Sequence, residues 1–505
     1  MSKTEKFTIP YEEMKLLRES STHLSVKGNG LLVARHPIPP EQKVLFQALR
    51  NQFDLKSPSY SKILFASIYS SFLEIGETLS LVILKTVFFL YYRSIKKNSF
   101  AVLFKSWAFD IPTVDTQDFY FGALPNEVHK HKISTGVLLD TGKSIPFWKL
   151  GKRLAAEFTL INSIKKSKDY RRLPEYLWTS WYAPLLIFID QLCGALELKR
   201  LSNTSNNVRR ILVSAASIEC LRAATRQQIL IAHRVCKAVN TLKTEKVVLL
   251  WEGQPWELLT THLLRKLSPA VAIIGYQHAP IFPHSLEILE PMRNTTPNVL
   301  FTSSEHYEAQ LKNNYLQTMS NAMTLGTIKY AERDVPSQIK LPIKTILLAP
   351  STADEATRLL ALASAFALKS PDFKFILRLH PAVRYKFSPT NSIALSFGKT
   401  LEHDLSVSSF LIYEGSSVVY DAILRGLKPF HLKYQDLYES DPLYELHEWK
   451  NCVTDADSLA LLIKRFLATD TRTYTMEWQR AVNFIQSMRS SVTLDRLNNF
   501  IQELQ

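Results

Sequence analysis

A carboxylate that could act as a general base follows an apolar stretch near the middle of the chain. The segment at residues 251–257 reads WEGQPWE, and Glu252 is its first charged residue. A carboxylate beside tryptophan at the end of a buried strand is expected to have a raised pKa and can accept a proton. Glu257 has a simpler explanation, since acids favour the first turn of a helix. We therefore predict Glu252 as a catalytic base. The substrate pocket around it is predicted to include Gln254, Trp256 and Glu257.

A second polar pair leaves the next apolar stretch. The sequence GYQHAP occupies residues 275–280 and places Gln277 and His278 at the start of a loop that contains proline. A single histidine of this kind more often has a structural role. Beside a cleft, it could instead bind a hydroxyl or a phosphate. We predict His278 as a second catalytic residue and Gln277 as part of the pocket.

Another histidine ends an apolar run in the last third of the chain. The run closes with RLHP, and Pro381 requires an extended backbone where the chain leaves the strand. His380 is then at the carboxyl end of that strand, with Arg378 two residues before it. Because parallel strands end at one edge of a sheet, we expect His380 and Arg378 to line a pocket shared with the next motif.

The stretch FLIYEGSSVVYDAILRGLKPFHL, at residues 410–432, reads as strand, turn, helix, turn and strand. Glu414 and Gly415 break the first strand, and Ser416 or Ser417 stands where a helix N-cap belongs. Two hydroxyls and free backbone N–H groups at a helix N-terminus favour an anion such as phosphate. For the stretch taken alone, a plain serine cap is the alternative.

Strands alternate with helices around these motifs, which predicts α/β structure with parallel sheets and right-handed crossovers. Ligands of such folds bind at the carboxyl ends of the strands. In the first part we expect strands at 99–107, 246–251, 270–276 and 298–302 and helices at 147–198, 208–242, 255–266 and 304–314. In the second part we expect strands at 345–348, 373–379 and 410–413 and helices at 354–368, 458–467, 474–488 and 494–504.

A change to polar sequence after residue 326 divides the chain. We interpret residues 327–342, with two prolines, as an interdomain linker. This gives one Rossmann-like domain at 99–326 and a second at 343–505, and two such domains in tandem would face a cleft. Residues 1–98 precede them as a mostly helical extension.

Residues 63–92 of that extension are strongly apolar and aromatic. The charged residues among them are Glu74, Glu77 and Lys85, and the longest uncharged run, at 63–73, is shorter than the ~20 residues of a membrane-spanning helix. A basic edge follows at 93–97. The pattern fits either a pair of core helices or an interfacial segment that holds the protein on an acidic membrane.

The composition is globular, with a marked excess of positive charge. Of 505 residues, 46% are hydrophobic and 21% are charged, and the formal net charge is +15. Scattered lysines and arginines favour anionic partners, but no basic arm or known binding pattern points to nucleic acid. The four cysteines are far apart, which makes a zinc site or a disulfide framework unexpected. The first residues lack the apolar core of a signal peptide, so we expect a cytoplasmic protein.

Common cofactor and metal motifs are absent. The sequence contains no GxGxxG and no P-loop, which weakens an assignment to NAD(P) or ATP. It also contains no HExxH and no GxSxG. Asp455-Ala456-Asp457 formally matches the DxD signature for metal and nucleotide, but Asp457 precedes an apolar helix as a cap would. We therefore expect neither a metal nor a cofactor.

Together these motifs resemble those of the GT-B glycosyltransferases of bacterial surface-polysaccharide assembly, most closely the sialyltransferases, polysialyltransferases and Kdo transferases. That group carries an acidic motif with glycine in the first domain, and an HP motif and a Ser-Ser or Ser-Thr motif in the second. The matching pairs here are Glu252-Gly253, His380-Pro381 and Ser416-Ser417. The likeness covers residues 99–505. Trp251 stands where the group has the first of two acids.

The resemblance implies a role for each motif. Glu252 would deprotonate the acceptor hydroxyl, while His380, Pro381 and residues 414–417 would hold the nucleotide. The donor would be a nucleotide sugar, with a CMP-sugar favoured over UDP or GDP sugars, and transfer would need no metal. The acceptor would be a lipid-linked glycan of lipopolysaccharide or capsule, which would place the enzyme peripherally on the inner face of the cytoplasmic membrane.

Two other functions share some of these features. A polyol-phosphate transferase of the teichoic-acid type has the same fold, an early Gln/His motif and a late Ser motif, but its product would contain phosphorus. A non-catalytic, membrane-associated scaffold of polysaccharide assembly would use the aromatic N-terminal region and would keep its biological activity without Glu252.

Overall fold

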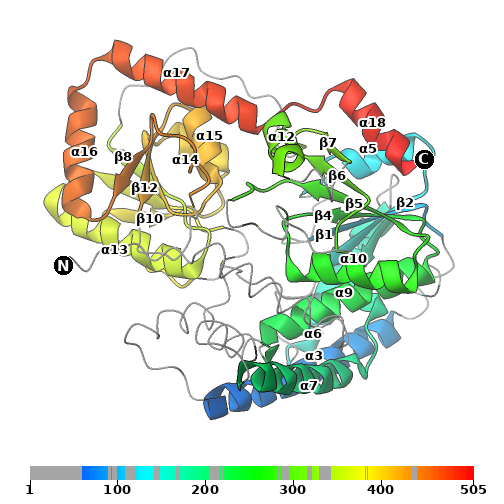
Figure 1. The fold of residues 1–505 in the computed structure, drawn as a ribbon. Coiled ribbons are helices and arrows are strands. Elements are labelled where there is room, and N and C mark those ends of the chain that lie inside the picture. Colours follow the sequence, from blue (N-terminus) through cyan, green and yellow to red (C-terminus); the bar gives the residue numbers. More distant parts are fainter. Residues whose placement is uncertain are drawn as a thin grey trace. The chain divides into compact units, whose positions relative to one another are not determined.

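The computed structural model describes most of the chain from Tyr60 onwards (Figure 1). The described residues are 60–88, 93, 99–107, 118, 120–140, 148–166, 171–203, 217, 220–221, 223–282, 285, 288, 295–314, 321–328, 343–380, 383, 385–433 and 441–505. They form two compact units, each built on its own sheet. Residues 1–59 and most of the expected linker, 329–342, lie outside the described residues.

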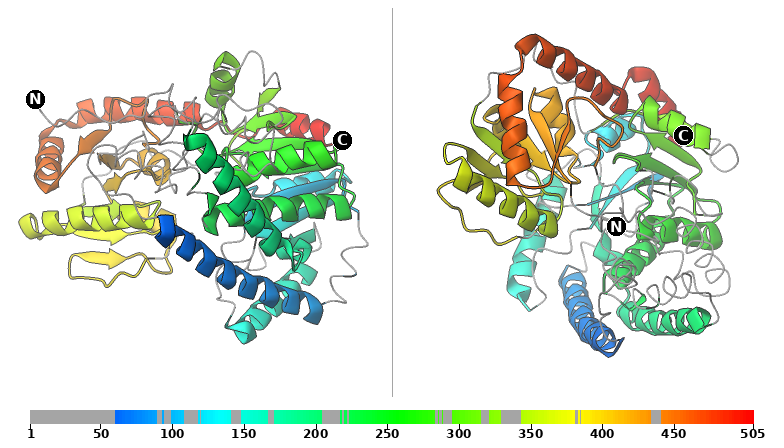
Figure 2. Two further views of the ribbon diagram at one scale, coloured as in Figure 1. Left: turned by 60° about the horizontal axis from the view of Figure 1, so that its bottom comes forward. Right: turned by 60° about the vertical axis from the view of Figure 1, so that its left-hand side comes forward.

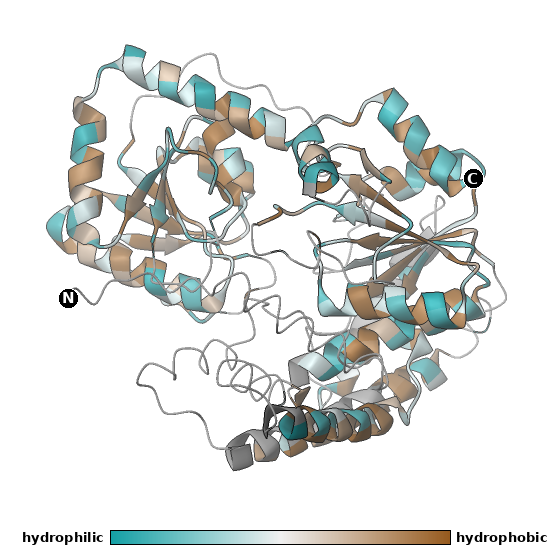
Figure 3. Ribbon diagram, viewed as in Figure 1, coloured by the Kyte–Doolittle hydropathy of each residue, from teal (hydrophilic) through white to brown (hydrophobic). Residues whose placement is uncertain are grey.

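The first unit, here called the seven-stranded unit, contains a parallel sheet in the order β3-β2-β1-β4-β5-β6-β7. Its strands are β1 (Val102–Trp107), β2 (Thr135–Asp140), β3 (Arg171–Pro174), β4 (Lys246–Leu250), β5 (Ala272–Gln277), β6 (Val299–Thr302) and β7 (Ala322–Thr324). Most residues of these strands are buried and apolar, as expected where helices cover both faces of a parallel sheet. The strands appear largely brown in the hydropathy colouring of Figure 3.

Five helices lie in the same unit as this sheet: α5 (Leu124–Lys130), α9 (Ala223–Thr241), α10 (Pro255–Leu267), α12 (Glu305–Asn314) and α18 (Leu494–Leu504). The last of them comes from the far end of the sequence. The ring of Phe500 packs on Phe301 at a centroid distance of 4.9 Å and lies 6.5 Å from the ring of Phe104. The expected second domain at 343–505 included this helix, whereas the structure places it with the first sheet because its apolar face packs there.

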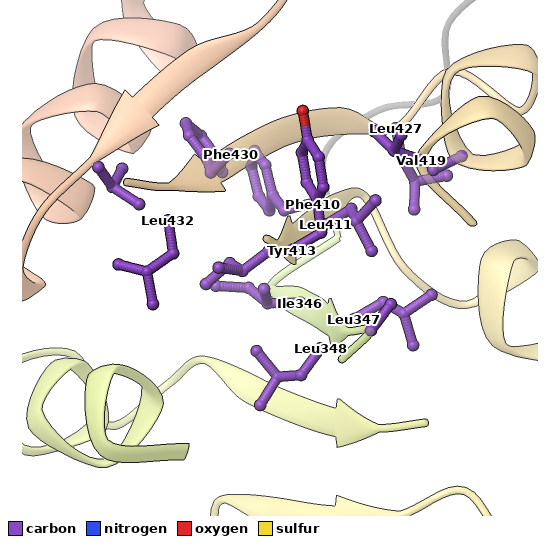
Figure 4. Packing of buried hydrophobic residues seen from close by; sticks show 14 of the residues in the cluster. Ile346, Leu347, Leu348, Phe410, Leu411, Tyr413, Val419, Leu427, Phe430 and Leu432 are labelled. Atoms are coloured by element: carbon purple, nitrogen blue, oxygen red, sulfur yellow. The ribbon is translucent and has the colours of Figure 1, made fainter. Parts of the chain in front are cut away.

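The second unit, here called the six-stranded unit, has a parallel sheet in the order β10-β9-β8-β11-β12-β13. Its strands are β8 (Thr345–Leu348), β9 (Lys374–Leu377), β10 (Ile393–Leu395), β11 (Phe410–Tyr413), β12 (Lys428–Leu432) and β13 (Asn451–Val453). Its helices are α13 (Ala353–Lys369), α14 (Leu401–Ser406), α15 (Val418–Leu424), α16 (Ala456–Ala468) and α17 (Thr471–Met488). Figure 4 shows side chains of its central strands gathered in one apolar core.

The strand–turn–helix–turn–strand pattern expected at 410–432 is present as β11, α15 and β12. Gly426 follows the helix with a φ of +81°, a conformation that glycine adopts without a steric penalty. The fold class is thus confirmed as α/β with two parallel sheets.

Three further helices are described in the seven-stranded unit: α3 (Tyr60–Val87), α6 (Leu150–Lys166) and α7 (Ala183–Asn203). Helix α3 is the blue helix of Figure 2. It is one continuous helix and not the pair considered from the sequence. Among the helices described, none has the length and apolarity needed to cross a membrane.

Three strands of the first sheet were not expected from the sequence: β2, β3 and the short β7, which pairs with β6. Strand β2 lies where no strand or helix was expected, although TGVLLD is buried along its whole length. The helix expected over 147–198 is interrupted by β3 and by a 3₁₀ turn at Glu175–Trp178. Tertiary pairing explains both, because β3 pairs with β2 and β2 pairs with β1. The helix expected over 208–242 is described as α9 from Ala223.

Candidate functional site

Two of the residues predicted from the sequence meet at the carboxyl edge of the seven-stranded sheet. Strands β4 and β5 are neighbours, and Leu250 is in register with Tyr276. Glu252 and His278 each follow that pair by two residues. Their side chains approach closely, with His278 Nε2 at 2.9 Å from Glu252 Oε1. We call this pair the Glu252–His278 dyad.

The dyad is accessible but not fully solvated. The side chain of Glu252 is 31% exposed and that of His278 is 17% exposed. The ring of Tyr276 stacks on the His278 ring at a centroid distance of 6.3 Å, and Tyr120 contacts it edge-on at 4.9 Å. Aromatic rings therefore limit the positions of His278, while part of the Glu252 carboxylate faces solvent.

Glu257 supports the turn that carries Glu252. Its carboxylate is buried, and Oε2 accepts hydrogen bonds from the backbone N–H groups of Glu252 at 2.8 Å and Gln254 at 2.9 Å. Gly253 lies between them with a φ of +76°. Burial, together with the charge of Glu252, raises the pKa of Glu257 well above its ordinary value. The buried Glu257 carboxylate therefore holds the backbone of the turn that carries Glu252.

The other predicted pocket residues differ in exposure. Gln254 is partly buried, and its amide nitrogen lies 3.3 Å from Glu252 Oε2. Gln277 is fully buried, and its Oε1 accepts a hydrogen bond of 3.1 Å from the backbone N–H of Ser303. Trp256 is buried with its ring edge-on to Trp107 at 5.8 Å. Gln254 is thus in contact with the dyad through Glu252.

A loop after β1 adds residues that the sequence analysis did not select. Asp118 Oδ1 accepts hydrogen bonds from the backbone N–H groups of Tyr120 and Phe121, both at 2.9 Å, and from the Ser106 hydroxyl at 2.7 Å. This arrangement fixes the loop that presents Tyr120 to His278. Burial raises the pKa values of Asp118 and Tyr120, and the charge of Glu252 contributes for Tyr120. Aspartate favours turns because its side chain accepts hydrogen bonds from backbone N–H groups two or three residues later. Asp118 was therefore a turn signal that the sequence analysis could have used.

A buried ion pair lies at the same edge, under the tryptophans. Lys105 Nζ is 3.1 Å from Glu175 Oε2, and both side chains are almost completely buried. Lys105 also lies over the Trp107 ring at 4.1 Å and the Trp256 ring at 5.3 Å. Burial raises the pKa of Glu175, and the Lys105 charge opposes that rise. Lys105 thus connects Glu175 with the two tryptophan rings at this edge.

In the six-stranded unit, the motif after β9 is divided between an internal contact and an exposed side chain. Arg378 Nη1 donates to Asp404 Oδ2 at 2.7 Å, and Asp404 is completely buried. His380 is exposed. Pro381, predicted beside it, lies outside the described residues. His380 is therefore the described side chain of this motif that faces solvent.

The motif after β11 is divided in the same way. Glu414 is buried and accepts two hydrogen bonds from Arg358 Nε, at 2.9 and 3.1 Å. Gly415 is half-buried, Ser416 is buried and Ser417 is exposed. Ser417 occupies the N-cap position of α15 without accepting a capping hydrogen bond through its side chain. Its hydroxyl is therefore not used in the cap.

A further network in this unit centres on Asp441. Its Oδ1 accepts a hydrogen bond of 2.8 Å from the Tyr413 hydroxyl, and Lys450 Nζ donates to Oδ2 at 2.7 Å. His431 Nδ1 is 3.9 Å from the same carboxylate. Burial, followed by the charge of Asp441, raises the pKa of Tyr413 well above its ordinary value. No periodic pattern in the sequence indicates this network, because its members are separated by loops.

The DxD-like sequence has a structural role. Asp455, and not Asp457 as expected, is the N-cap of α16, since it accepts a hydrogen bond of 2.8 Å from the Ser458 N–H. Asp457 forms an ion pair with Lys369. In the part of the chain that the structure describes, no group of three or more His, Cys, Asp or Glu side chains could hold a metal ion.

The chain was compared with known proteins at three levels. No protein-family model and no curated protein matches its sequence. Similar solved structures include the glycosyltransferase SnogD from Streptomyces nogalater, with 12% identity, a TM-score of 0.44, and coverage of 81% of this chain and 100% of that one.

Two other similar structures are MurG from Acinetobacter baumannii and UDP-GlcNAc 2-epimerase from Neisseria meningitidis. The first has 11% identity, a TM-score of 0.42, and coverage of 80% of this chain and 99% of that one. The second has 10% identity, a TM-score of 0.41, and coverage of 80% and 98%. At these identities and scores, no activity of this chain follows from the likeness.

Proposed function

We propose that this protein is a glycosyltransferase that moves a sugar from a nucleotide-sugar donor to a hydroxyl group of an acceptor. The observation that carries the proposal is the Glu252–His278 dyad, in which a carboxylate and an imidazole lie 2.9 Å apart at the carboxyl edge of a parallel sheet. This edge is where α/β folds bind their ligands. The motif resemblance described above supports the same reaction.

Glu252 is the proposed general base. Its carboxylate is partly exposed, so an acceptor hydroxyl can reach it, and the turn that holds it is fixed by Glu257. The base removes the hydroxyl proton as the acceptor oxygen attacks the sugar, and the bond from the sugar to the nucleotide phosphate breaks. His278 orients the carboxylate through its Nε2 contact and, when protonated, stabilises its negative charge.

The six-stranded unit is the proposed site for the nucleotide. The two exposed polar side chains of its motifs, His380 and Ser417, follow β9 and β11, which both pair with β8. They therefore share one edge of this sheet and can contact phosphate oxygens there. Glu414 and Arg378 would support the loops through their internal ion pairs.

We further propose a CMP-sugar as donor, metal-independent transfer, and a lipid-linked glycan of lipopolysaccharide or capsule as acceptor. These details rest on the motif resemblance and on the net charge of +15, which suits anionic substrates. With such an acceptor, the enzyme would act in the cytoplasm, peripherally on the inner membrane face.

The proposal is tested by incubating the purified protein with CMP-, UDP- and GDP-sugars, CDP-glycerol and a bacterial glycolipid extract. Released nucleotide and labelled product are both measured. We expect sugar in the product and loss of turnover in Glu252→Gln. Glu245→Gln is a matched control, because Glu245 is exposed and precedes the same strand.

Other outcomes would replace the proposal. Phosphorus in the product, with CDP-glycerol consumed, would identify a polyol-phosphate transferase. Undiminished biological activity of a folded Glu252→Ala variant would identify a scaffold.

A further inference from the structure

Helix α3 presents an apolar stripe to solvent. Six side chains at helical spacing are exposed along one face, from the first turns of the helix to its last residue: Phe65, Ile68, Phe72, Leu79, Ile83 and Val87. Phe65 is 74% exposed and Phe72 is 68% exposed. Spacings of three, four and seven residues keep such side chains on one side of a helix. The opposite side, with Leu81 and Leu84, is buried.

Helix α7 is built in the same way. Its inner face packs in an apolar cluster with α9 and α10, in which Ile187 is a buried member. Its outer face, together with the residue before the helix, exposes Tyr182, Leu185, Leu186, Ile189 and Leu196. A helix that is apolar on opposite faces is expected to have a non-aqueous environment on both.

The two helices that carry these stripes are neighbours. Helices α3 and α7 pack against each other and lie side by side in Figure 1. Helix α6 is fixed to α3 by a hydrogen bond of 2.6 Å from Arg153 Nη1 to the Ser80 hydroxyl. It adds exposed Phe158, and Trp148 is exposed just before its first turn. Large exposed side chains thus accumulate on three neighbouring helices.

The extent of this apolar surface exceeds that of ordinary scattered exposure. Aromatic side chains cover roughly 150–250 Å² each, so the five named here, each about half to three-quarters exposed, amount to roughly 500–800 Å². The eight aliphatic side chains add to this area. The largest apolar patch of a typical monomer is roughly 300–600 Å². A larger apolar surface of this kind is typical of a site that binds a protein or a membrane.

Charge and residue type indicate which partner fits. Exposed cations accompany the three helices, namely Arg93 after α3, Lys149 and Lys152 at the start of α6, and Arg200 at the end of α7. The whole chain carries a net charge of +15. Tryptophan and tyrosine with basic neighbours favour the headgroup region of a bilayer, where a ring is partly dry and a cation meets anionic lipid.

We propose that the outer faces of α3 and α7 form a docking surface for an anionic lipid bilayer, with both helices lying along the membrane plane. The apolar stripes enter the boundary between headgroups and acyl chains, and the basic residues contact lipid phosphates. This inference deepens the proposed function, on which it rests only in that the surface would bring the enzyme to a lipid-linked acceptor.

The test is flotation of the purified protein with vesicles of phosphatidylcholine containing phosphatidylglycerol, and with phosphatidylcholine alone. We expect binding to the anionic vesicles and about tenfold less binding to the neutral ones. Two paired variants, Phe65→Asn with Phe72→Asn and Leu185→Asn with Ile189→Asn, should each reduce binding at least tenfold. Circular dichroism and thermal unfolding check that each variant is folded.

A matched control distinguishes binding through this surface from nonspecific binding of any exposed apolar side chain to vesicles. Phe397 is 86% exposed in the six-stranded unit, so Phe397→Asn removes an equally exposed apolar side chain and should leave binding unchanged. Equal loss in the control, or wild-type binding in both paired variants, would overturn the proposal. So would a stable dimer that the paired variants convert to monomer, since a second copy would then cover the surface.

Failure of this inference can be told from failure of the proposed function. Vesicle binding needs no turnover, so Glu252→Gln should float like the wild type. Sugar transfer to a detergent-soluble acceptor without vesicle binding would leave the function and remove the docking surface. Vesicle binding without any transfer would do the opposite.

Discussion

The carboxyl edges of the two sheets use their charged residues differently. At the edge of the seven-stranded sheet, Glu252 and His278 contact each other while remaining partly exposed. At the edge of the six-stranded sheet, Arg378 and Glu414 are committed to internal ion pairs, and the exposed side chains are polar or weakly basic. Under the proposed function, the first edge would move the proton and the second would hold the nucleotide.

The largest expected effect falls on the dyad. Replacing Glu252 by Gln keeps the shape of the side chain but removes the proton acceptor, so turnover should fall by about 10²–10⁴. Transfer assays with saturating donor measure the change, and the melting temperature should stay within a few degrees of the wild type. A loss below tenfold would show that both edges are only binding surfaces.

The next effect tests the internal network of the six-stranded unit. Asp441→Ala leaves the mostly buried Lys450 without its carboxylate and should lower the free energy of unfolding by about 3–5 kcal/mol. The control is Asp372→Ala, which removes an exposed pair with Lys344 and should cost at most about 1 kcal/mol. Denaturant titration gives both values, and similar losses in the two variants would contradict the assigned difference.

A smaller effect tests whether Glu257 stabilises the turn that carries Glu252. Glu257→Ala leaves the N–H groups of Glu252 and Gln254 without their acceptor and should destabilise the protein by about 1–3 kcal/mol. Glu257→Gln retains an acceptor oxygen and should restore most of this loss. Denaturant titration measures both stabilities, and a Glu257→Gln variant as unstable as Glu257→Ala would contradict this supporting role.

The same pair of variants has a defined pH dependence. Burial raises the folded-state pKa of Glu257, so the folded protein binds more protons than the unfolded chain above the ordinary glutamate pKa. The contribution of this group to stability is therefore lost as pH rises through the folded pKa. Glu257→Gln does not titrate, so its stability relative to the wild type should increase between pH 5 and pH 8. Parallel pH profiles would argue against the raised pKa.

The smallest effect concerns ligand binding at the second edge. His380→Ala should weaken nucleotide binding about tenfold, which corresponds to roughly 1.4 kcal/mol. Calorimetry with CMP, CDP, UDP and GDP measures the change. His403→Ala is the matched control, because His403 is an exposed histidine on α14 of the same unit. Equal effects of the two substitutions would remove His380 from the binding site.

The sequence by itself determined the positions of the main strands and the strand ends at which chemistry could occur. Apolar runs followed by polar residues predicted the ends of β4 and β5 because the hydrophobic pattern stops where the chain leaves the core. Placing Glu252 and His278 at one edge then needed only the rule that parallel strands end together. Short periodic signals were sufficient there because β4 and β5 are consecutive along the chain.

Tertiary structure decided which of these polar groups are available. Arg378 pairs with Asp404 and Glu414 with Arg358, and partners 26 and 56 residues away leave no trace in local periodicity. The same holds for Tyr120, which reaches His278 through pairing of β1 with β4, and for α18, which packs beside β6 from the end of the chain. A side chain becomes reactive or structural through its neighbours in space, and those neighbours are fixed only when the sheets assemble.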